Sequence, residues 1–218
     1  MSFESNRTKG RVAMLLILAL PIVWVIVFSF LRYLFQFSPS STFSVGIFLP
    51  IIAITVYILF LMAMNGFAKY YNDSRIFRNV LYVFILSISF SVIWLIVSNM
   101  FVYPLFDQLT AYANSPGSVP PLSILYSVLQ VMVPIWLGVS LVGIINAFLI
   151  RRAFYALSEK SGEKNFRQAG FFIFLGGLLI IVVVGAFLVL VGWIFAVLGF
   201  FSMKPIGSEA PSVMQVSG

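Results

Sequence analysis

The sequence is dominated by apolar stretches that continue for about twenty or more residues without a charged side chain. About twenty apolar residues in a helix match the roughly 30 Å hydrocarbon core of a bilayer. Because lipid offers no hydrogen-bond partner, a chain that crosses it must satisfy its backbone internally, and apolar runs of this length do so as helices. We therefore predict an all-α fold, a polytopic transmembrane helix bundle.

Composition sets the class of protein. The chain has 218 residues, of which 61% are hydrophobic and 9% are charged. A soluble domain averages about half apolar residues and a quarter charged residues. The chain also has no cysteine and no histidine, which excludes disulfides, Cys/His zinc sites and histidine-ligated haem. We expect an integral membrane protein with no cofactor and no bound metal.

The chain is expected to form one transmembrane helical domain. Residues 1–10 form a cytoplasmic amino-terminal segment, residues 11–203 the membrane domain and residues 204–218 a polar tail. A loop rich in Pro, Gly and Ser covers residues 104–122. Five spans are predicted, at residues 11–35, 43–68, 80–103, 122–150 and 170–203. The connections after the second and fourth spans, residues 69–79 and 151–169, are named the first and the second elbow.

Basic residues set the expected orientation. Of the 13 Lys and Arg residues, eleven fall on one side of the membrane if the spans alternate. Because Lys and Arg are enriched in cytoplasmic connections, we expect a multi-pass protein of the cell membrane with a cytoplasmic amino terminus. The net charge of +7 then indicates contact with anionic lipid headgroups rather than with nucleic acid. The eleven are Arg7, Lys9, Arg11, Lys69, Arg75, Arg78, Arg151, Arg152, Lys160, Lys164 and Arg167.

The last apolar segment, residues 170–203, leaves the span count open. As one helix its 34 positions would be about 50 Å long, against a hydrocarbon core of about 30 Å. Its glycines are spaced 7, 8, 7 and 7 residues apart, and two helical turns take about 7.2 residues, so one helix would hold them on one face. We favour one long tilted helix, which places the carboxyl terminus outside. The alternative is a hairpin, which gives six spans and a cytoplasmic carboxyl terminus.

The glycines of this segment form a predicted helix-packing face. Small residues let helices in lipid approach each other closely, either within one chain or between subunits. We favour packing within the chain, against the second to fourth spans. The alternative is a seam for another subunit, which gains support from a helix too long for the bilayer, because its apolar end needs cover. The five glycines are Gly170, Gly177, Gly185, Gly192 and Gly199.

Both elbows combine basic and aromatic residues. "FAKYYNDSRIFRN" after the second span can be aligned with "FYALSEKSGEKNFRQ" after the fourth, since each ends in Phe-Arg-amide just before a span. The similarity is weak and chance accounts for it equally well; a true repeat would indicate the symmetry seen in some transporters. Asp73 or Ser74 is placed to cap the next helix. The elbow residues expected to contact headgroups or partners are Lys69, Tyr70, Tyr71, Arg75, Arg78, Arg151, Arg152 and Arg167.

The stretches "GFAKYYNDSRIFRNVLYVFIL" and "RRAFYALSEKSGEKNFRQAGFFIFLGG", with the glycine-punctuated end at "FFSMK", resemble an archaeal-type multi-span membrane family of unknown function. The resemblance covers most of the chain from about residue 50 to residue 204, and the connection "FSPSSTFS" between the first two spans departs from it. It implies a helical membrane architecture and brings no established activity.

The positions of the ionisable residues argue against catalysis within the membrane. Charged residues inside spans are costly and normally functional, yet the central parts of these spans contain none. Glu159 and Glu163 are interpreted as part of a solvated helix rather than as an acid/base pair. If a polar pathway exists, Gln130 with Ser127 and Ser140 would form it. The acidic residues are Glu4, Asp73, Asp107, Glu159, Glu163 and Glu209.

We therefore predict a non-catalytic integral membrane protein, an accessory or assembly subunit that packs against other membrane helices or against itself. The alternative is a small transporter or channel built on the weak repeat. A third hypothesis is an enzyme acting on lipid headgroups, with Arg151, Arg152 and Arg167 binding phosphate, but no nucleophile or set of metal ligands accompanies these arginines.

Overall fold

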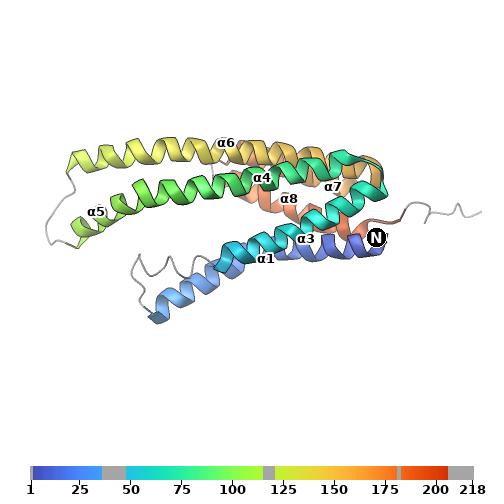
Figure 1. The fold of residues 1–218 in the computed structure, drawn as a ribbon, viewed down its shortest axis with the longest axis horizontal. Coiled ribbons are helices and arrows are strands. Elements are labelled where there is room, and N and C mark those ends of the chain that lie inside the picture. The colour runs from blue at the N-terminus through green and yellow to red at the C-terminus, as the bar shows by residue number, and fades with distance from the viewer. Residues whose placement is uncertain (1, 36–47, 115–120, 181–182, 206–218) are drawn as a thin grey trace, which may run out of the picture.

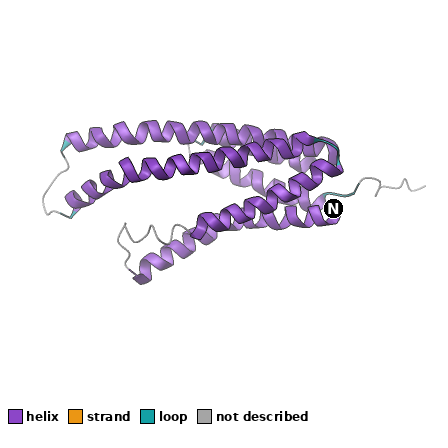
Figure 2. Cartoon of the chain, viewed as in Figure 1, coloured by secondary structure: helices purple, strands orange, loops and turns teal. Residues whose placement is uncertain are grey.

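The computed structural model describes residues 2–35, 48–114, 121–180 and 183–205, and every regular element in these ranges is a helix (Figure 2). The predicted all-α class is confirmed. The elements are α1 (Phe3–Phe35), α3 (Phe48–Tyr70), α4 (Ser74–Val97), the π-helical segment η1 (Ser98–Val102), α5 (Tyr103–Ala113), α6 (Leu122–Ser161), α7 (Lys164–Leu178) and α8 (Val183–Ser202).

Several helices have the length and composition of membrane spans. Among the described residues, four helical stretches are long and apolar enough to cross a membrane: Ile52–Tyr70, Ser74–Tyr112, Leu122–Ser161 and Val184–Ser202. These stretches are consistent with a multi-pass membrane protein. The start of the predicted second span, residues 43–47, lies outside the described residues, as does most of the predicted tail.

The helices form two long pairs and a short hairpin (Figure 1). The first pair is α1 with α3, and the second is α6 with the continuous run of α4, η1 and α5. The hairpin of α7 and α8 packs on α6 through α7 and on α1 through α8. It lies beside only the part of the bundle that carries the amino terminus.

The segment 170–203 differs from the single helix that the glycine spacing favoured. Helix α7 ends at Leu178 and α8 begins at Val183, and the two helices run antiparallel. A β-carbon on Gly176 would lie 2.6 Å from the carbonyl oxygen of Gly185, so two glycines let the helices meet close to the turn. The hairpin alternative is therefore the observed one. The single-helix prediction was wrong because both helices have glycines at two-turn spacing.

The carboxyl end of α8 lies beside the amino-terminal turns of α1. The Arg7 Nη1 atom donates to the carbonyl oxygen of Met203 at 2.9 Å. Arg11 donates from Nε to Phe200 and from Nη2 to Phe201, both at 3.0 Å. Because the last carbonyls of a helix lack intrahelical donors, both arginines stabilise this helix end. The two ends of the described chain thus share one end of the bundle.

Three other helix boundaries differ from the sequence expectation. Helix α1 begins at Phe3, so the predicted amino-terminal segment is mostly helical. The predicted loop 104–122 begins with α5, whose first turn accepts Pro104 because the first turn needs no backbone donor. Helix α6 continues through residues 151–161, so most of the second elbow is helix. Each elbow therefore consists of two helix ends joined by a short turn.

The buried core lies at the end of the bundle that carries the amino terminus. Five phenylalanine rings with no exposed surface meet there: Phe60 and Phe67 of α3, Phe154 of α6, Phe166 of α7 and Phe200 of α8. The ring centroids of Phe166 and Phe200 lie 4.9 Å apart, and those of Phe154 and Phe166 lie 5.8 Å apart. Each such pair contributes about 0.5–1.5 kcal/mol beyond its buried area. The cluster therefore holds four helices together at this end.

The turns between helices carry the capping groups that their sequences supply. The Asp73 carboxylate accepts from the backbone N–H of Arg75 and caps α4, which confirms Asp73 as the predicted cap. The Glu163 carboxylate accepts from the backbone N–H of Asn165 and caps α7. Gly162 ends α6 with φ 73°, a left-handed conformation that a residue without a β-carbon adopts at little cost.

Candidate functional site: a basic cleft between α4 and α6

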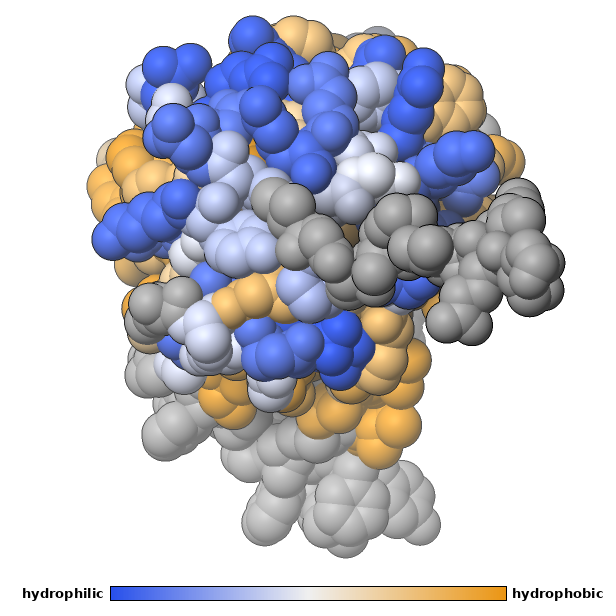
Figure 3. Space-filling model, turned by 90° about the vertical axis from the view of Figure 1, so that its right-hand side faces the viewer, coloured by the Kyte–Doolittle hydropathy of each residue, from blue (hydrophilic) through white to orange (hydrophobic). Residues whose placement is uncertain are grey.

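The end of the bundle that carries the amino terminus is its hydrophilic end. Figure 3 looks onto this end and shows hydrophilic residues gathered over it, with hydrophobic residues along the flanks. Both interhelical turns, after α3 and after α6, lie here. The basic elbow residues are therefore brought together in space, although they are up to 98 positions apart in the sequence.

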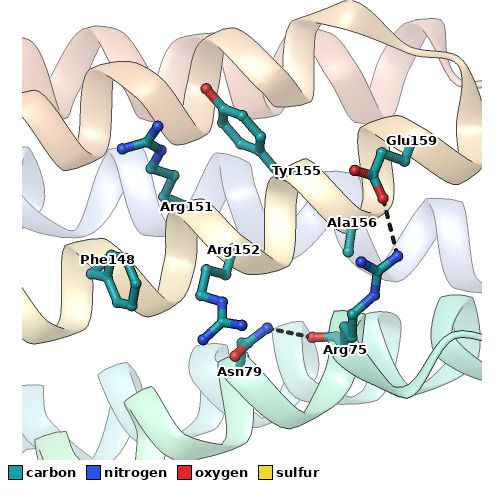
Figure 4. A pocket seen from close by; sticks show the side chains of 8 residues that line it. All are labelled: Arg75, Asn79, Phe148, Arg151, Arg152, Tyr155, Ala156 and Glu159. Atoms are coloured by element: carbon teal, nitrogen blue, oxygen red, sulfur yellow. Dashed lines mark hydrogen bonds and ion pairs between the residues drawn. The ribbon is translucent and has the colours of Figure 1, made fainter.

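A cleft of about 340 Å³ opens at this end between α4 and α6 (Figure 4). Helix α4 contributes two residues one turn apart. Helix α6 contributes a stripe at spacings of three and four residues, as one helix face requires. The cleft therefore combines three guanidinium groups with one carboxylate. Its lining residues are Arg75, Asn79, Phe148, Arg151, Arg152, Tyr155, Ala156 and Glu159.

Arg75 is held at the mouth of the cleft by two carboxylates. Its Nη2 atom lies 2.7 Å from Oδ2 of Asp73 and 3.0 Å from Oε2 of Glu159. Its Nε atom donates to both carboxylate oxygens of Asp73, at 3.0 and 3.1 Å. These contacts hold the pKa of Asp73 below its ordinary value, chiefly through the side-chain hydrogen bond from Arg75. The ion pair between Arg75 and Glu159 also ties α4 to α6 across the cleft.

Arg151 and Arg152 form no ion pair within the part of the chain that the structure describes. Instead, the Arg152 guanidinium lies 5.6 Å from the ring centroid of Phe148. The Arg151 guanidinium lies 4.7 Å from Phe174 of α7 and 5.1 Å from Tyr155. Figure 4 shows Arg152 directed towards α4 and Arg151 directed to the other side, near Tyr155. Such ring contacts hold a cation in place and leave its N–H donors available.

Asn79 closes the α4 side of the cleft. It is 6% exposed, and its amide nitrogen donates to the carbonyl oxygen of Arg75 at 2.8 Å. Figure 4 shows its side chain beside the guanidinium of Arg152. Sequence reasoning missed Asn79 as a lining residue, and the only signal was its position one turn after Arg75.

The remaining elbow residues lie outside the cleft; some are exposed and Tyr71 is buried. Lys69, Arg78 and Arg167 are exposed, and the guanidinium of Arg167 lies 5.8 Å from the ring centroid of Tyr155. The structure corrects the expectation for Tyr71, which is only 7% exposed.

The two tyrosines of the first elbow have different environments. The Tyr71 ring stacks on Phe67 of the core, with centroids 6.3 Å apart, and burial raises the pKa of its hydroxyl to about 12. The Tyr70 ring lies at the rim, 5.2 Å from Phe3 and 4.9 Å from Tyr71. Tyr71 is thus a core residue rather than a headgroup anchor, and only Tyr70 lies where it could contact headgroups.

The predicted glycines divide between two interhelical contacts. A β-carbon on Gly170 would lie 3.2 Å from the Cα atom of Arg151, and one on Gly177 would lie 2.5 Å from the β-carbon of Ala147. These two glycines of α7 therefore face α6.

The other three glycines lie on α8 and face α7 or the turn between α7 and α8. A β-carbon on Gly192 would lie 2.8 Å from the backbone nitrogen of Ile173, and one on Gly199 would lie 2.8 Å from the Phe166 ring. Gly185 contacts the carbonyl of Leu179 at the turn. All five glycines lie at close contacts with another helix or with the turn of this chain.

The residues of the possible polar pathway do not meet. Ser127 and Gln130 are exposed on the part of α6 far from the basic cleft. Ser140 is 6% exposed, and its hydroxyl donates to the carbonyl of Trp136 in its own helix at 2.8 Å. The Ser127 hydroxyl likewise donates within α6, to Ser123. Both hydroxyls therefore donate to backbone carbonyls of α6 rather than to each other or to another helix.

The residues that the sequence alignment pairs between the two elbows do not occupy equivalent positions in the structure. Each is followed by a helix with an acidic cap, Asp73 or Glu163. Counted from these caps, however, the fully buried third residue is Ile76 in α4 and Phe166 in α7. Phe77, which the alignment pairs with Phe166, is one position later and only partly buried. The shared feature is the acidic cap rather than the Phe-Arg-amide sequence.

Comparison with known proteins places the chain in a family. A family model described as a protein of unknown function, DUF996, matches residues 52–194, which include both elbows and the whole basic cleft. The uncharacterized protein MJ1644 of Methanocaldococcus jannaschii is 31% identical over 159 residues, covering 70% of this chain and 80% of that protein. No solved structure matches the chain. The resemblance to an archaeal-type family of unknown function is thus confirmed, and the chain belongs to the DUF996 family.

Proposed function

We propose that the chain is a non-catalytic accessory or assembly subunit of the membrane, whose helices pack against those of another subunit or of a second copy. The observation that carries this proposal is the short reach of the α7–α8 hairpin. It packs beside only one half of the bundle and leaves the other half of α4 and α6 with little intramolecular cover.

The depth of the hairpin follows from its contact with α6. Gly170 lies level with Arg151, where the apolar part of α6 ends. From Gly170 to Leu179 the chain advances about 14 Å at ~1.5 Å per residue. From Arg151 to Leu122, α6 extends about 43 Å in the same direction. Because the hydrocarbon core is about 30 Å thick, a boundary at the level of Arg151 puts the turn of the hairpin near the middle of the bilayer. Helix α8, although long enough to cross, then extends past this boundary towards the polar end.

A turn at this depth needs an unusual environment. Irregular backbone inside a membrane is tolerated where protein buries it or where it lines a water-filled cavity. In this chain the side chains of Leu179 and Ile180 are 38% and 40% exposed, so the turn is not fully covered by its own bundle. Protein cover from another subunit satisfies this requirement and supports an accessory role.

The same half of the bundle exposes its helices on several faces. In the most apolar stretch of α3, 44% of the residues are buried, against 11% for α4 and 6% for α6. Four consecutive residues of α4 point in four directions around the helix and all are more than 40% exposed: Ile93, Trp94, Leu95 and Ile96. A helix in this state has room for neighbours on every face except the one towards α6.

The distribution of acidic groups supports a non-catalytic role. Asp73, Glu159 and Glu163 lie at the polar end, where the first two pair with Arg75 and the third caps α7. Each of these carboxylates thus has a structural contact. In the proposed orientation the basic end is cytoplasmic, as the concentration of Lys and Arg favours, and both described chain ends face the cytoplasm.

Purification of the full chain from its membrane in a mild detergent tests the proposal. We expect a particle with a mass well above the 24.4 kDa of one chain, containing either a second copy or a distinct membrane protein. A monodisperse particle with the mass of one chain would contradict the accessory role.

A small transporter or channel is the second candidate, favoured by the π-helical segment Ser98–Val102 in the apolar part of the α4–α5 run. Such segments frequently occur at functional sites. Here Ser98 and Asn99 donate to carbonyls of the preceding turn, at 2.6 and 2.7 Å. A water-filled cavity beside the α7–α8 turn would then replace protein cover. Solute flux in reconstituted vesicles that is lost in Asn99→Ala would support this candidate.

A further inference from the structure

We propose that the basic cleft binds the phosphate ester of an anionic membrane lipid between Arg152 and Arg75, with the lipid's acyl chain lying along α6 below the cleft. This inference goes beyond the accessory role, since it requires only that the chain lies in a membrane. Its basis is the combination of unpaired guanidinium donors, a defined cavity and an apolar stripe that begins where the cavity ends.

The charge of the cleft is unbalanced on its α6 side. Arg75 is paired with two carboxylates, whereas Arg152 and Arg151 lie over aromatic rings and form no ion pair among the described residues. The planar guanidinium group presents paired N–H donors that match two phosphate oxygens. A cation held over a ring without an anion has the donors and the charge to bind one. Arg152, directed into the cleft towards α4, is the principal phosphate ligand.

Arg75 provides the second ligand from the opposite wall. Its Nε and Nη2 atoms are used by Asp73 and Glu159, and its Nη1 atom makes no hydrogen bond within the described residues. Glu159 is 61% exposed at its side chain, so an incoming phosphate can compete with it for Arg75 at little cost in desolvation. Glu159 thus competes weakly with the phosphate for Arg75.

The level of the cleft corresponds to the phosphate layer of a bilayer. Helix α6 is apolar up to Ile150, and the first charged residues after its apolar run are Arg151 and Arg152. The remaining turns, to Ser161, extend about 14 Å further into the polar region. A phosphate bound at Arg152 would therefore lie where lipid headgroups meet the hydrocarbon.

An apolar stripe descends from the cleft on the same face of α6. Residues spaced four, three and four positions from Arg152 form this face: Phe148, Ile145 and Leu141. They are 44%, 40% and 60% exposed. An acyl chain covalently attached to the phosphate would cover this stripe, which a free phosphate ester cannot do. The stripe therefore assigns the phosphate to a lipid.

The test measures binding of three probes to the detergent-purified full chain by native mass spectrometry. The probes are phosphatidylglycerol, diacylglycerol with the same chains but no phosphate, and glycerol phosphate with no chains. We expect tight binding of phosphatidylglycerol alone. Equal binding of diacylglycerol would overturn the phosphate contact, and equal binding of glycerol phosphate would overturn the assignment to a lipid.

Variants separate this site from the general positive charge of the surface. Arg152→Gln should weaken phosphatidylglycerol binding by about tenfold or more, as loss of a charge-assisted hydrogen bond requires. Arg152→Lys should fall between, because an ammonium lacks the paired donors. Arg78→Gln is the matched control: Arg78 is exposed, lies outside the cleft and removes the same charge. Equal losses in Arg152→Gln and Arg78→Gln would overturn the site.

Glu159→Gln should change phosphatidylglycerol binding in the opposite direction to Arg152→Gln. Removing the competing carboxylate should strengthen phosphatidylglycerol binding severalfold, an increase that a damaged fold would not produce. Weaker binding in Glu159→Gln would contradict the proposed competition. The mass of the purified particle is measured for every variant, so that loss of lipid and loss of a partner subunit are observed separately.

Discussion

The side chain of Asn6 in α1 lies against the Cα atom of Gly66 in α3, in the space that a β-carbon on residue 66 would occupy. Asn6 has no exposed surface, and its amide nitrogen and oxygen have no hydrogen-bond partner in the part of the chain that the structure describes. The contact is therefore steric: it sets how closely α1 and α3 approach at the polar end of the bundle.

This contact predicts that two substitutions are coupled. Gly66→Ala should destabilise the protein by about 1–3 kcal/mol, the usual cost of inserting a methyl group into a packed contact. In the Asn6→Ala background the same substitution should cost much less, because the obstructing amide is gone. Thermal unfolding of the single and double variants in detergent measures the coupling. Additive losses would show that α1 and α3 do not meet at these residues.

The hairpin predicts a contrast between two glycines. Gly192→Ala places a β-carbon 2.8 Å from the backbone nitrogen of Ile173 and 3.0 Å from the carbonyl oxygen of Ala169, and backbone atoms cannot move aside cheaply. We expect a loss of about 1–3 kcal/mol in unfolding free energy. Gly138→Ala is the matched control on α6, since nothing lies within 4 Å of its β-carbon. Similar stabilities for the two variants would contradict the close packing of α7 and α8.

The glycines also show how far the sequence could predict this fold. Their two-turn spacing indicated close helix approach, and each glycine does lie at a close contact with another part of the chain. The spacing could not distinguish one helix from two, because α7 and α8 each repeat it against a different neighbour. Gly176, which lies outside the two-turn series of glycines, marks the hairpin, because it meets Gly185 beside the turn. A turn formed by close glycine contact carries none of the usual Pro, Asn or Asp signals.

The candidate site was predictable in composition and not in geometry. The elbows identified Arg75, Arg151 and Arg152 as basic residues near one membrane face, but spacing alone could not show that α4 and α6 bring them to one cleft. Arg7 and Arg11 were read only as orientation signals. Their hydrogen bonds to the end of α8 join positions about 190 residues apart, which no local pattern reveals.

Acid should weaken the start of α4. Arg75 holds the pKa of Asp73 below its ordinary value of 3.8. A carboxyl whose pKa is lowered by folding contributes stability that is complete above the unfolded-state value and is lost as the pH falls through the folded-state value. Thermal stability should therefore decline below about pH 4, and Asp73→Asn should reduce this decline.

Two variants control for the cap and for general charge. Asp73→Ala also removes the capping oxygen and should cost about 1 kcal/mol more than Asp73→Asn at neutral pH. Asp107→Asn removes an exposed carboxylate that forms no ion pair among the described residues and controls for the loss of one negative charge. An identical acid profile in Asp73→Asn and the wild-type protein would contradict the role given to the Asp73–Arg75 pair.

The half-depth hairpin predicts a labelling pattern in a chain that has no cysteine of its own. Thr8→Cys and Lys204→Cys should react with an impermeant thiol reagent from the same side of the membrane, and Asn114→Cys from the other side. Leu179→Cys at the turn should react from neither side. Labelling of Leu179→Cys from the side that labels Asn114→Cys would show that the hairpin crosses the membrane completely.

In the proposed function, another membrane helix covers the exposed half of α4 and α6. Trp136 lies on this half of α6 and is 45% exposed, so a photoreactive amino acid placed there reports its neighbour in the native membrane. We expect a discrete protein adduct from position 136, heavier than one chain of 24.4 kDa. Adducts with lipid alone at this position would show that no protein covers this half of α6.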